Sequence, residues 1–310
     1  MNKKEFEVEI AGKKFVAVFS DLAEQANGSV ILKCEDTIVL ATAVISKDGR
    51  DNRGFFNLTV EYLEKYYASG LILGGQYNKR EGRPSDEAIL SSRIVDRTIR
   101  PLFAHHIKNA VQVIITVLSV GQADPGVLAI NAASLALGVS DIPWAGPVGA
   151  VHVGKLKGDG MKIEVDPYKA NNGETQYDLD LTVCGKDGEV CMIEAGASQI
   201  SEEELGSAFD LALKHIGEME NWQKKIIAEM GKKKLEFPKP VMNEKIKELF
   251  AQNIAPEMKN IFNGNKGESK KKIIELEEKW GTIVEENFTP STDYKLNKEN
   301  EQNRSDAKDY

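Results

Sequence analysis

The pattern that most restricts the fold is the alternation of apolar and polar residues near the start of the chain. Between Phe6 and Ile10 every second residue is apolar, as on one face of a strand, and the following Ala-Gly-Lys-Lys segment predicts a turn. Further short apolar segments lie at 30–33, 38–45 and 56–62. We therefore expect the chain to begin with hairpin-connected strands.

Helices are predicted only after these strands. Ser85, followed by two acidic residues, is typical of a helix start, and this helix should end near Arg100 because proline follows. Asp124-Pro125-Gly126 opens a second helix, whose alanines permit close approach of a neighbouring element. A long amphipathic helix is expected from Ser201 to about Met230.

Strands followed by helices predict an α+β fold, a mixed sheet with helices packed on it and then a small all-α module. We expect the core domain at 1–232, the helical module at 233–288, and a polar, disordered tail at 289–310. The sequence contains 40 Lys+Arg and 48 Asp+Glu, for a net charge of −8. This total argues against a wholly basic nucleic-acid coat protein but allows a local basic surface.

Arginines recur between residues 79 and 108 and give this segment a local positive charge. Three of them are spaced i, i+4 and i+7, which places them on one helical stripe opposite the apolar face. Guanidinium groups suit phosphate, and an aromatic ring beside them offers a stacking surface for an unpaired base. The residues predicted to bind RNA are Tyr77, Lys79, Arg80, Arg83 and Arg100, followed by Arg93 and Arg97.

A purely structural explanation of the same arginines stays open. Arg93 and Arg97 in particular have Asp96 within reach and can serve as ion-pair partners that stabilise the fold. The loop residues Lys79, Arg80 and Arg83 are therefore the better candidates for function.

Two long segments, 79–103 (KREGRPSDEAILSSRIVDRTIRPLF) and 124–154, carry a resemblance to a known family. They are similar to the first core domain of polynucleotide phosphorylases, and the resemblance covers about residues 5–230. It implies an RNase PH-like fold (ribosomal protein S5 domain 2-like). The helical module matches in position and character only.

The resemblance also implies a function. Members of this family form homotrimeric rings that degrade single-stranded RNA from the 3′ end, using inorganic phosphate to release nucleoside diphosphates with Mg²⁺ assisting. The phosphate site belongs to a second core domain, which this sequence does not contain. We therefore expect the chain to guide RNA and to build the ring, while Mg²⁺, phosphate and catalysis lie outside it.

The sequence departs from the family's catalytic pattern at two positions. The family's Gly-Ser-Ser phosphate turn is replaced by Asp124-Pro125-Gly126, in which a carboxylate repels phosphate and proline offers no N–H. Asp180 fits the catalytic aspartate, but Thr182 stands where a lysine is expected. Asp180 is thus a weak catalytic candidate, and Asp178 with Asp180 is a weak metal candidate.

Two other hypotheses stay open. In the first hypothesis, the chain is a complete, non-catalytic RNA-binding or scaffold subunit. In the second, this domain itself carries out phosphorolysis through Asp180. A continued reading frame beyond Tyr310, with a second core, would favour the fragment over the complete subunit. The sequence contains no membrane-length apolar run and no signal-peptide pattern, so we expect a cytoplasmic protein without membrane contact.

Overall fold

The computed structural model describes two compact units, which are treated separately below. Unit 1 holds the described residues up to Glu236, and unit 2 holds those from Phe237 onward. The described residues are 3–49, 56–72, 74, 82–157, 164–165, 177–238, 243–262, 269–289, 300–301, 303–304 and 307.

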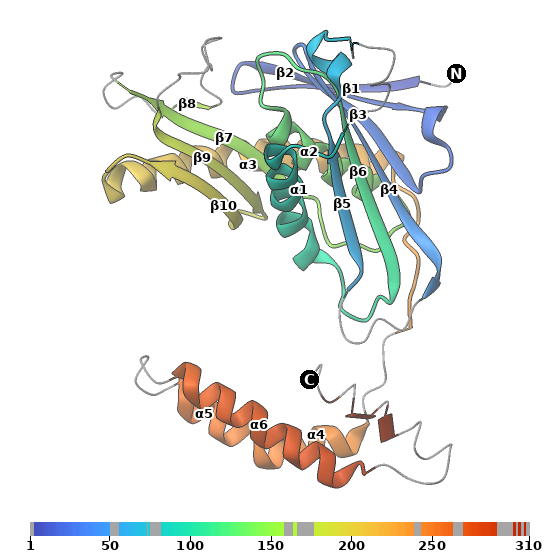
Figure 1. The fold of residues 1–310 in the computed structure, drawn as a ribbon, viewed down its shortest axis with the longest axis vertical. Helices are drawn as coiled ribbons and strands as arrows, with labels where there is room; N and C mark the ends of the chain where they lie inside the picture. The colour runs from blue at the N-terminus through green and yellow to red at the C-terminus, as the bar shows by residue number, and fades with distance from the viewer. Residues whose placement is uncertain are drawn as a thin grey trace. The chain divides into compact units, whose positions relative to one another are not determined.

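A six-stranded mixed sheet forms one side of unit 1 (Figure 1). Its strand order is β1-β2-β3-β4-β6-β5; β5 pairs with β6 in parallel and the other pairs are antiparallel. The predicted hairpins are present, because Ala11 and Gly12, and then Glu35, adopt the positive φ angles that tight turns need. The strands are β1 (Lys3–Ile10), β2 (Lys13–Ser20), β3 (Gly28–Cys34), β4 (Thr37–Gly49), β5 (Leu58–Leu63) and β6 (Asn109–Ser119).

A second sheet of four strands follows in the order β10-β9-β7-β8. Asp187 and Gly188, both at positive φ, form the turn that joins β9 to β10, and Asp-Gly is a pair that favours such turns. The strands are β7 (Gly149–Leu156), β8 (Glu164–Val165), β9 (Tyr177–Lys186) and β10 (Glu189–Ala197).

Three helices connect the two sheets (Figure 1). Helix α1 (Asp86–Ile99) packs on β5, and α2 (Pro125–Val139) packs on β3, β4 and β7. The alanines of α2 are buried, as the sequence predicts, and a side chain on Gly28 of β3 would lie 2.1 Å from the Ala136 carbonyl oxygen. Short 3₁₀ helices η1 (Asp21–Ala23), η2 (Tyr66–Ser69) and η3 (Arg100–Leu102) complete the unit.

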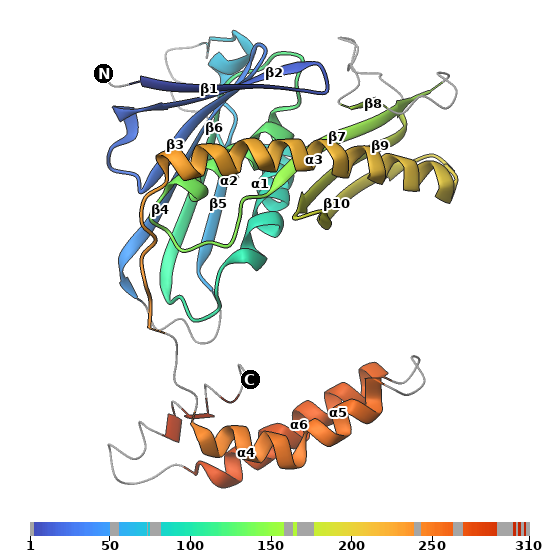
Figure 2. The ribbon, with the colours of Figure 1, turned by 180° about the vertical axis from the view of Figure 1, so that it is seen from behind.

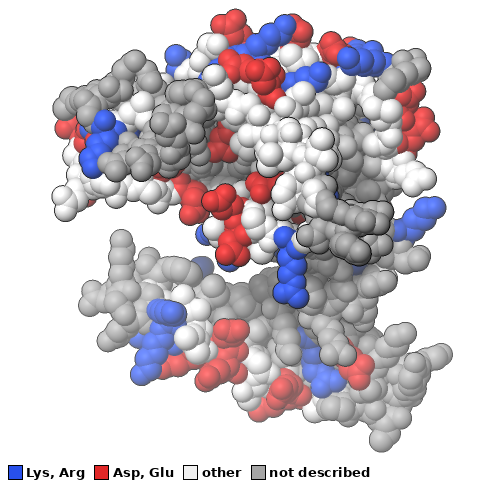
Figure 3. Space-filling view, turned by 45° about the horizontal axis from the view of Figure 1, so that its top comes forward, with Lys and Arg blue, Asp and Glu red and all other residues white. Residues whose placement is uncertain are grey.

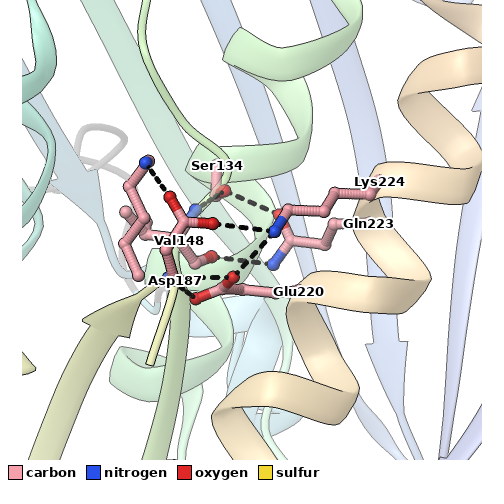
Figure 4. Close-up of polar contacts among 7 residues, drawn as sticks. Ser134, Val148, Asp187, Glu220, Gln223 and Lys224 are labelled. Atoms are coloured by element: carbon pink, nitrogen blue, oxygen red, sulfur yellow. Dashed lines mark hydrogen bonds and ion pairs between the residues drawn. The ribbon is translucent and has the colours of Figure 1, made fainter. Parts of the chain in front are cut away.

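Helix α3 (Glu202–Met230) runs across both sheets (Figure 2). It begins with a capping box between Ser201 and Glu204. In its second half the buried Gln223 amide accepts a hydrogen bond from Ser134 Oγ of α2 (2.6 Å) and donates one to the Val148 carbonyl (2.8 Å) (Figure 4). Asn131 of α2 bonds both backbone groups of Ala150, so uncharged side chains dock α2 and α3 onto the start of β7.

The segment after α3 belongs to unit 1 and extends it beyond the predicted boundary at residue 232. The Lys232 amide donates to the Val139 carbonyl (3.1 Å), and the Leu235 amide donates to the Asp141 carbonyl (2.8 Å). The Lys234 ammonium donates to the carbonyls of Leu137, Gly138 and Ser140. These carbonyls at the end of α2 have no partner within the helix, so Lys234 closes its C-terminus.

Unit 2 is the helical module. Its apolar core joins Ile246, Ile254, Leu276, Trp280 and neighbouring side chains. The first predicted helical stretch is divided in two because a proline at 256 interrupts the backbone ladder. The helices are α4 (Glu244–Asn253), α5 (Ala255–Phe262) and α6 (Ser269–Asn287).

The structure differs from the expected disorder at part of the tail. Asn303 and Ala307 are buried, and the Trp280 indole N–H donates to the Ala307 carbonyl (2.7 Å). The polar composition of the tail does not indicate these contacts, because the buried residues, Asn303 and Ala307, are not large apolar ones.

Candidate nucleic-acid interface

Helix α1 carries the predicted arginine surface, and its start is as expected. The Ser85 hydroxyl accepts a hydrogen bond from the Ala88 amide (3.0 Å), and Asp86 and Glu87 lie in the first turn. Val95 and Ile99 are buried against the sheet. This anchoring turns the opposite face of the helix outward.

Arg93 and Arg97 lie on that outward face and are exposed. Neither forms an ion pair with another described residue, so Asp96 does not neutralise them as the structural explanation supposed. Arg83, just before the helix, is also exposed. These three guanidinium groups are therefore presented to solvent with their donors available.

Arg100 is arranged differently. Its Nε and Nη2 atoms donate to the two carboxylate oxygens of Asp96 (2.9 and 2.7 Å), and Nη1 and Nη2 donate to the carbonyls of Phe56 and Leu58 (3.1 Å each). The side chain thus ties the end of α1 to the start of β5. We predicted an RNA contact for Arg100, but its guanidinium donors already bind acceptors within the chain. Asp96 and the two backbone carbonyls accept them.

The other predicted loop residues, Tyr77, Lys79 and Arg80, lie outside the described residues. Their RNA contact stays a prediction. On the face shown in Figure 3, acidic and basic side chains are intermingled, which agrees with a binding surface that is local and small.

The N-terminus of α2 is the segment in which the sequence departs from the expected Gly-Ser-Ser phosphate turn. Here Asp124 Oδ1 accepts the Gly126 amide (2.7 Å), and Pro125 is the first residue of the helix. The free N–H groups and positive dipole of a helix N-terminus attract anions. At α2 the chain's own carboxylate accepts the Gly126 amide, so negative charge at this helix end disfavours phosphate.

Asp180, the weak catalytic candidate, lies on β9 beside His152 of β7. Asp180 Oδ1 is 2.8 Å from His152 Nε2, and the His152 ring is buried against Tyr177. Sequence reasoning missed this contact, which depends on the pairing of His152 with Thr182 across the two strands. No short sequence pattern predicts the pairing register of β7 and β9.

Asp178 and Asp180 share one face of β9, since the residue between them is buried. In the described part of the chain, no group of three or more histidine, cysteine, aspartate or glutamate side chains is arranged to hold a metal ion. A magnesium site at these two aspartates is thus an untested prediction that lacks a third ligand among the described residues.

Comparisons with known proteins agree with this architecture. Residues 13–143 match the RNase PH family, described as 3′ exoribonuclease family, domain 1. This part of the chain is therefore similar to domain 1 of that exoribonuclease family. The RNase PH-like fold predicted from the sequence is confirmed, and a solved structure of rice (Oryza sativa) Rrp46 shares it with a TM-score of 0.55 at 19% identity, over 69% of this chain and 94% of that one.

The predicted resemblance to polynucleotide phosphorylases is also confirmed. Polyribonucleotide nucleotidyltransferases of Syntrophomonas wolfei and Halothermothrix orenii are both 39% identical, over 82% and 92% of this chain. The Chloroflexus aggregans enzyme is 45% identical over 78% of it. The chain spans only 35%, 40% and 32% of the length of these three relatives.

Proposed function

We propose that this chain is the first core and helical module of a phosphorolytic 3′-to-5′ exoribonuclease, in which it binds single-stranded RNA and helps to assemble the ring. The observation that carries the proposal is its similarity to polyribonucleotide nucleotidyltransferases over most of its length. In this arrangement, phosphate attacks the terminal phosphodiester in a second core domain, and nucleoside diphosphates leave from there.

The state of α2 supports this division of labour. Phosphorolysis needs a site that binds phosphate before it attacks, and Asp124 fills the corresponding helix terminus with negative charge. Asp180 is paired with His152 and has no neighbouring cation two residues on. We therefore place catalysis, Mg²⁺ and phosphate outside this chain.

The exposed arginines support the RNA-binding part. Arg83, Arg93 and Arg97 present planar, permanently charged donors that match phosphate oxygens. Tyr77, Lys79 and Arg80 belong to the proposed surface on the strength of the sequence alone. Arg100 is left out because its donors hold α1 to β5.

A homotrimeric assembly and a cytoplasmic location complete the proposal. The homotrimer rests on the family resemblance, and the location rests on the sequence patterns described above. None of the described helices combines the length and the apolar character of a membrane span.

A phosphorolysis assay tests the division of labour. The purified chain is incubated with labelled single-stranded RNA, phosphate and Mg²⁺, alongside a full-length polyribonucleotide nucleotidyltransferase. We expect the chain to bind the RNA but to release no nucleoside diphosphate. Release that disappears on Asp180→Asn would instead assign phosphorolysis to this core.

Salt dependence of RNA affinity tests the arginine surface. The logarithm of the RNA association constant falls linearly with the logarithm of salt concentration. For a single strand, each lost phosphate contact makes this negative slope shallower by ~0.7. Arg93→Ala with Arg97→Ala should therefore weaken binding and flatten this slope, whereas Lys225→Ala, which removes an exposed charge from α3, serves as the control. An unchanged slope would contradict the proposed role of the two arginines.

A further inference from the structure

Two adjacent tyrosines on η2 project from the surface of unit 1. Tyr66 is 49% exposed and Tyr67 is 56% exposed. Aromatic rings are enriched where proteins bind partners, since they offer a large, stiff contact area at little cost in conformational entropy. They lie in a segment that contains glycines and has no periodicity, so no repeating pattern distinguishes them in the sequence.

The backbone beneath the rings is held in place. The Ala68 amide donates to the Lys65 carbonyl (2.8 Å), and the Leu71 amide donates to the Tyr66 carbonyl (3.0 Å). Ala68 is buried, and its carbonyl accepts the Val120 amide from the end of β6 (3.0 Å). Tyr66 and Tyr67 are thus presented by an anchored turn.

This turn is connected to the start of the arginine surface. The Ser85 hydroxyl at the start of α1 donates to Glu64 Oε2 (3.2 Å), two residues before the tyrosines. Arg83 lies two residues before Ser85, and Arg93 and Arg97 continue along α1. The tyrosine turn and the start of the arginine-bearing helix are thus joined by a direct hydrogen bond.

We propose that Tyr66 and Tyr67 stack on unpaired bases of single-stranded RNA whose phosphates are bound by the arginines of α1. The inference rests on the proposed RNA-binding function and adds the groups that contact the bases. Base stacking and phosphate binding are complementary, since every base has an aromatic face whatever its sequence. The exposed arginines farther along α1 carry permanent positive charge, which favours a nucleic acid over an apolar protein partner.

The test compares two double variants of the full chain. Tyr66→Leu with Tyr67→Leu removes the aromatic faces and keeps apolar bulk, whereas Tyr66→Phe with Tyr67→Phe keeps the faces. Leu71→Ala removes an exposed aliphatic side chain from the same turn and is the matched control. Affinity is measured for a labelled oligoadenylate and for an abasic oligonucleotide with the same backbone, over a range of salt concentrations.

We expect the leucine pair to weaken oligoadenylate binding by about 5- to 150-fold for each base that loses its ring. The phenylalanine pair and Leu71→Ala should bind like the unaltered chain. The salt slope should stay the same for all three, and abasic binding should not change, because neither the phosphate contacts nor their counterions are touched.

Different failures identify different errors. If the unaltered chain binds no RNA, the proposed function and this inference fall together. If it binds RNA and the leucine pair binds equally well, only the stacking role is overturned. Equal loss of abasic binding, or a change of oligomeric state in the leucine pair, would assign the rings to folding or to a protein contact instead.

Discussion

Helices α1 and α2 begin alike but differ in what they leave exposed. Each starts at a side-chain cap, Ser85 for α1 and Asp124 for α2. Four of the 14 residues of α1 are buried, whereas twelve of the 15 residues of α2 are buried. One helix therefore offers a charged outer surface, and the other is a central element whose surface is taken up by its neighbours.

Within one domain, α1 thus has a surface that is available to a ligand, whereas α2 mainly packs against other elements. On α1 the cations face solvent, where a phosphate backbone can reach them. On α2 even the helix N-terminus, the usual place for an anion, is closed by the carboxylate of Asp124. Exposure, more than the amount of charge, indicates which helix contacts a ligand.

The largest effect is expected where α2 docks. Gln223→Ala should lower the free energy of unfolding by about 2–5 kcal/mol, because it leaves Ser134 Oγ and the Val148 carbonyl without their buried partner and opens a cavity. Lys225→Ala, an exposed position on the same helix, should stay within about 0.5 kcal/mol. Urea unfolding measures both, and similar values would show that the polar network contributes nothing specific.

Local sequence predicts the elements better than it predicts this docking. The alternation, the Asp187-Gly188 turn and the alanines of α2 all indicate their structures correctly. The partners of Gln223 lie 89 and 75 residues away, and Lys234 closes α2 from at least 94 residues away. These contacts form only when the whole domain folds, and no short pattern encodes them.

The second largest effect on stability is expected at Arg100, which differs from Arg93 in its contacts. Arg100→Ala should destabilise unit 1 by about 1–3 kcal/mol, because its hydrogen bonds to Asp96 and to the β5 carbonyls are lost. Arg93→Ala should change the stability by less than about 0.5 kcal/mol. Thermal unfolding distinguishes them, and equal losses would place Arg93 in the fold rather than on the RNA surface.

This division could not be read from the spacing. The i, i+4, i+7 pattern predicts three arginines on one stripe, and Asp96 lies within sequence reach of all of them. The carbonyls of Phe56 and Leu58, more than 40 residues away, decide that Arg100 is the one engaged. Arg93 and Arg97 are exposed because the burial of Val95 and Ile99 turns their face of α1 outward.

The third effect tests the closed terminus of α2. Asp124→Ala should cost about 0.5–2 kcal/mol, because the Gly126 amide loses its acceptor at the start of the helix. Asp124→Ser restores a capping oxygen and should recover most of the loss. If the serine variant is as unstable as the alanine variant, Asp124 stabilises the domain through some contact other than the cap.

The smallest effect concerns the pH dependence of stability. It comes from the charged turn between β9 and β10, whereas the hydrogen bonds that dock α2 should not depend on pH. Hydrogen bonds from Lys186, then from Lys224, hold the pKa of Asp187 down at about 2, while the amide and hydroxyl groups that dock α2 are uncharged (Figure 4). A lowered pKa in the folded chain contributes stability above the unfolded value of about 4, and this contribution is lost as the pH falls toward 2.

Asp187→Asn keeps the shape and tolerates the positive φ of the turn, but it does not titrate. Its stability should therefore fall less steeply between about pH 4 and 2 than that of the unaltered chain. Glu204, whose pKa Lys155 lowers to about 2, retains part of the acid dependence in the variant, so the slope decreases without vanishing. Acid unfolding followed by circular dichroism measures this slope. Identical profiles would show that the ion pairs of the hairpin do not contribute to folding, and that acid acts on the docking of the helices instead.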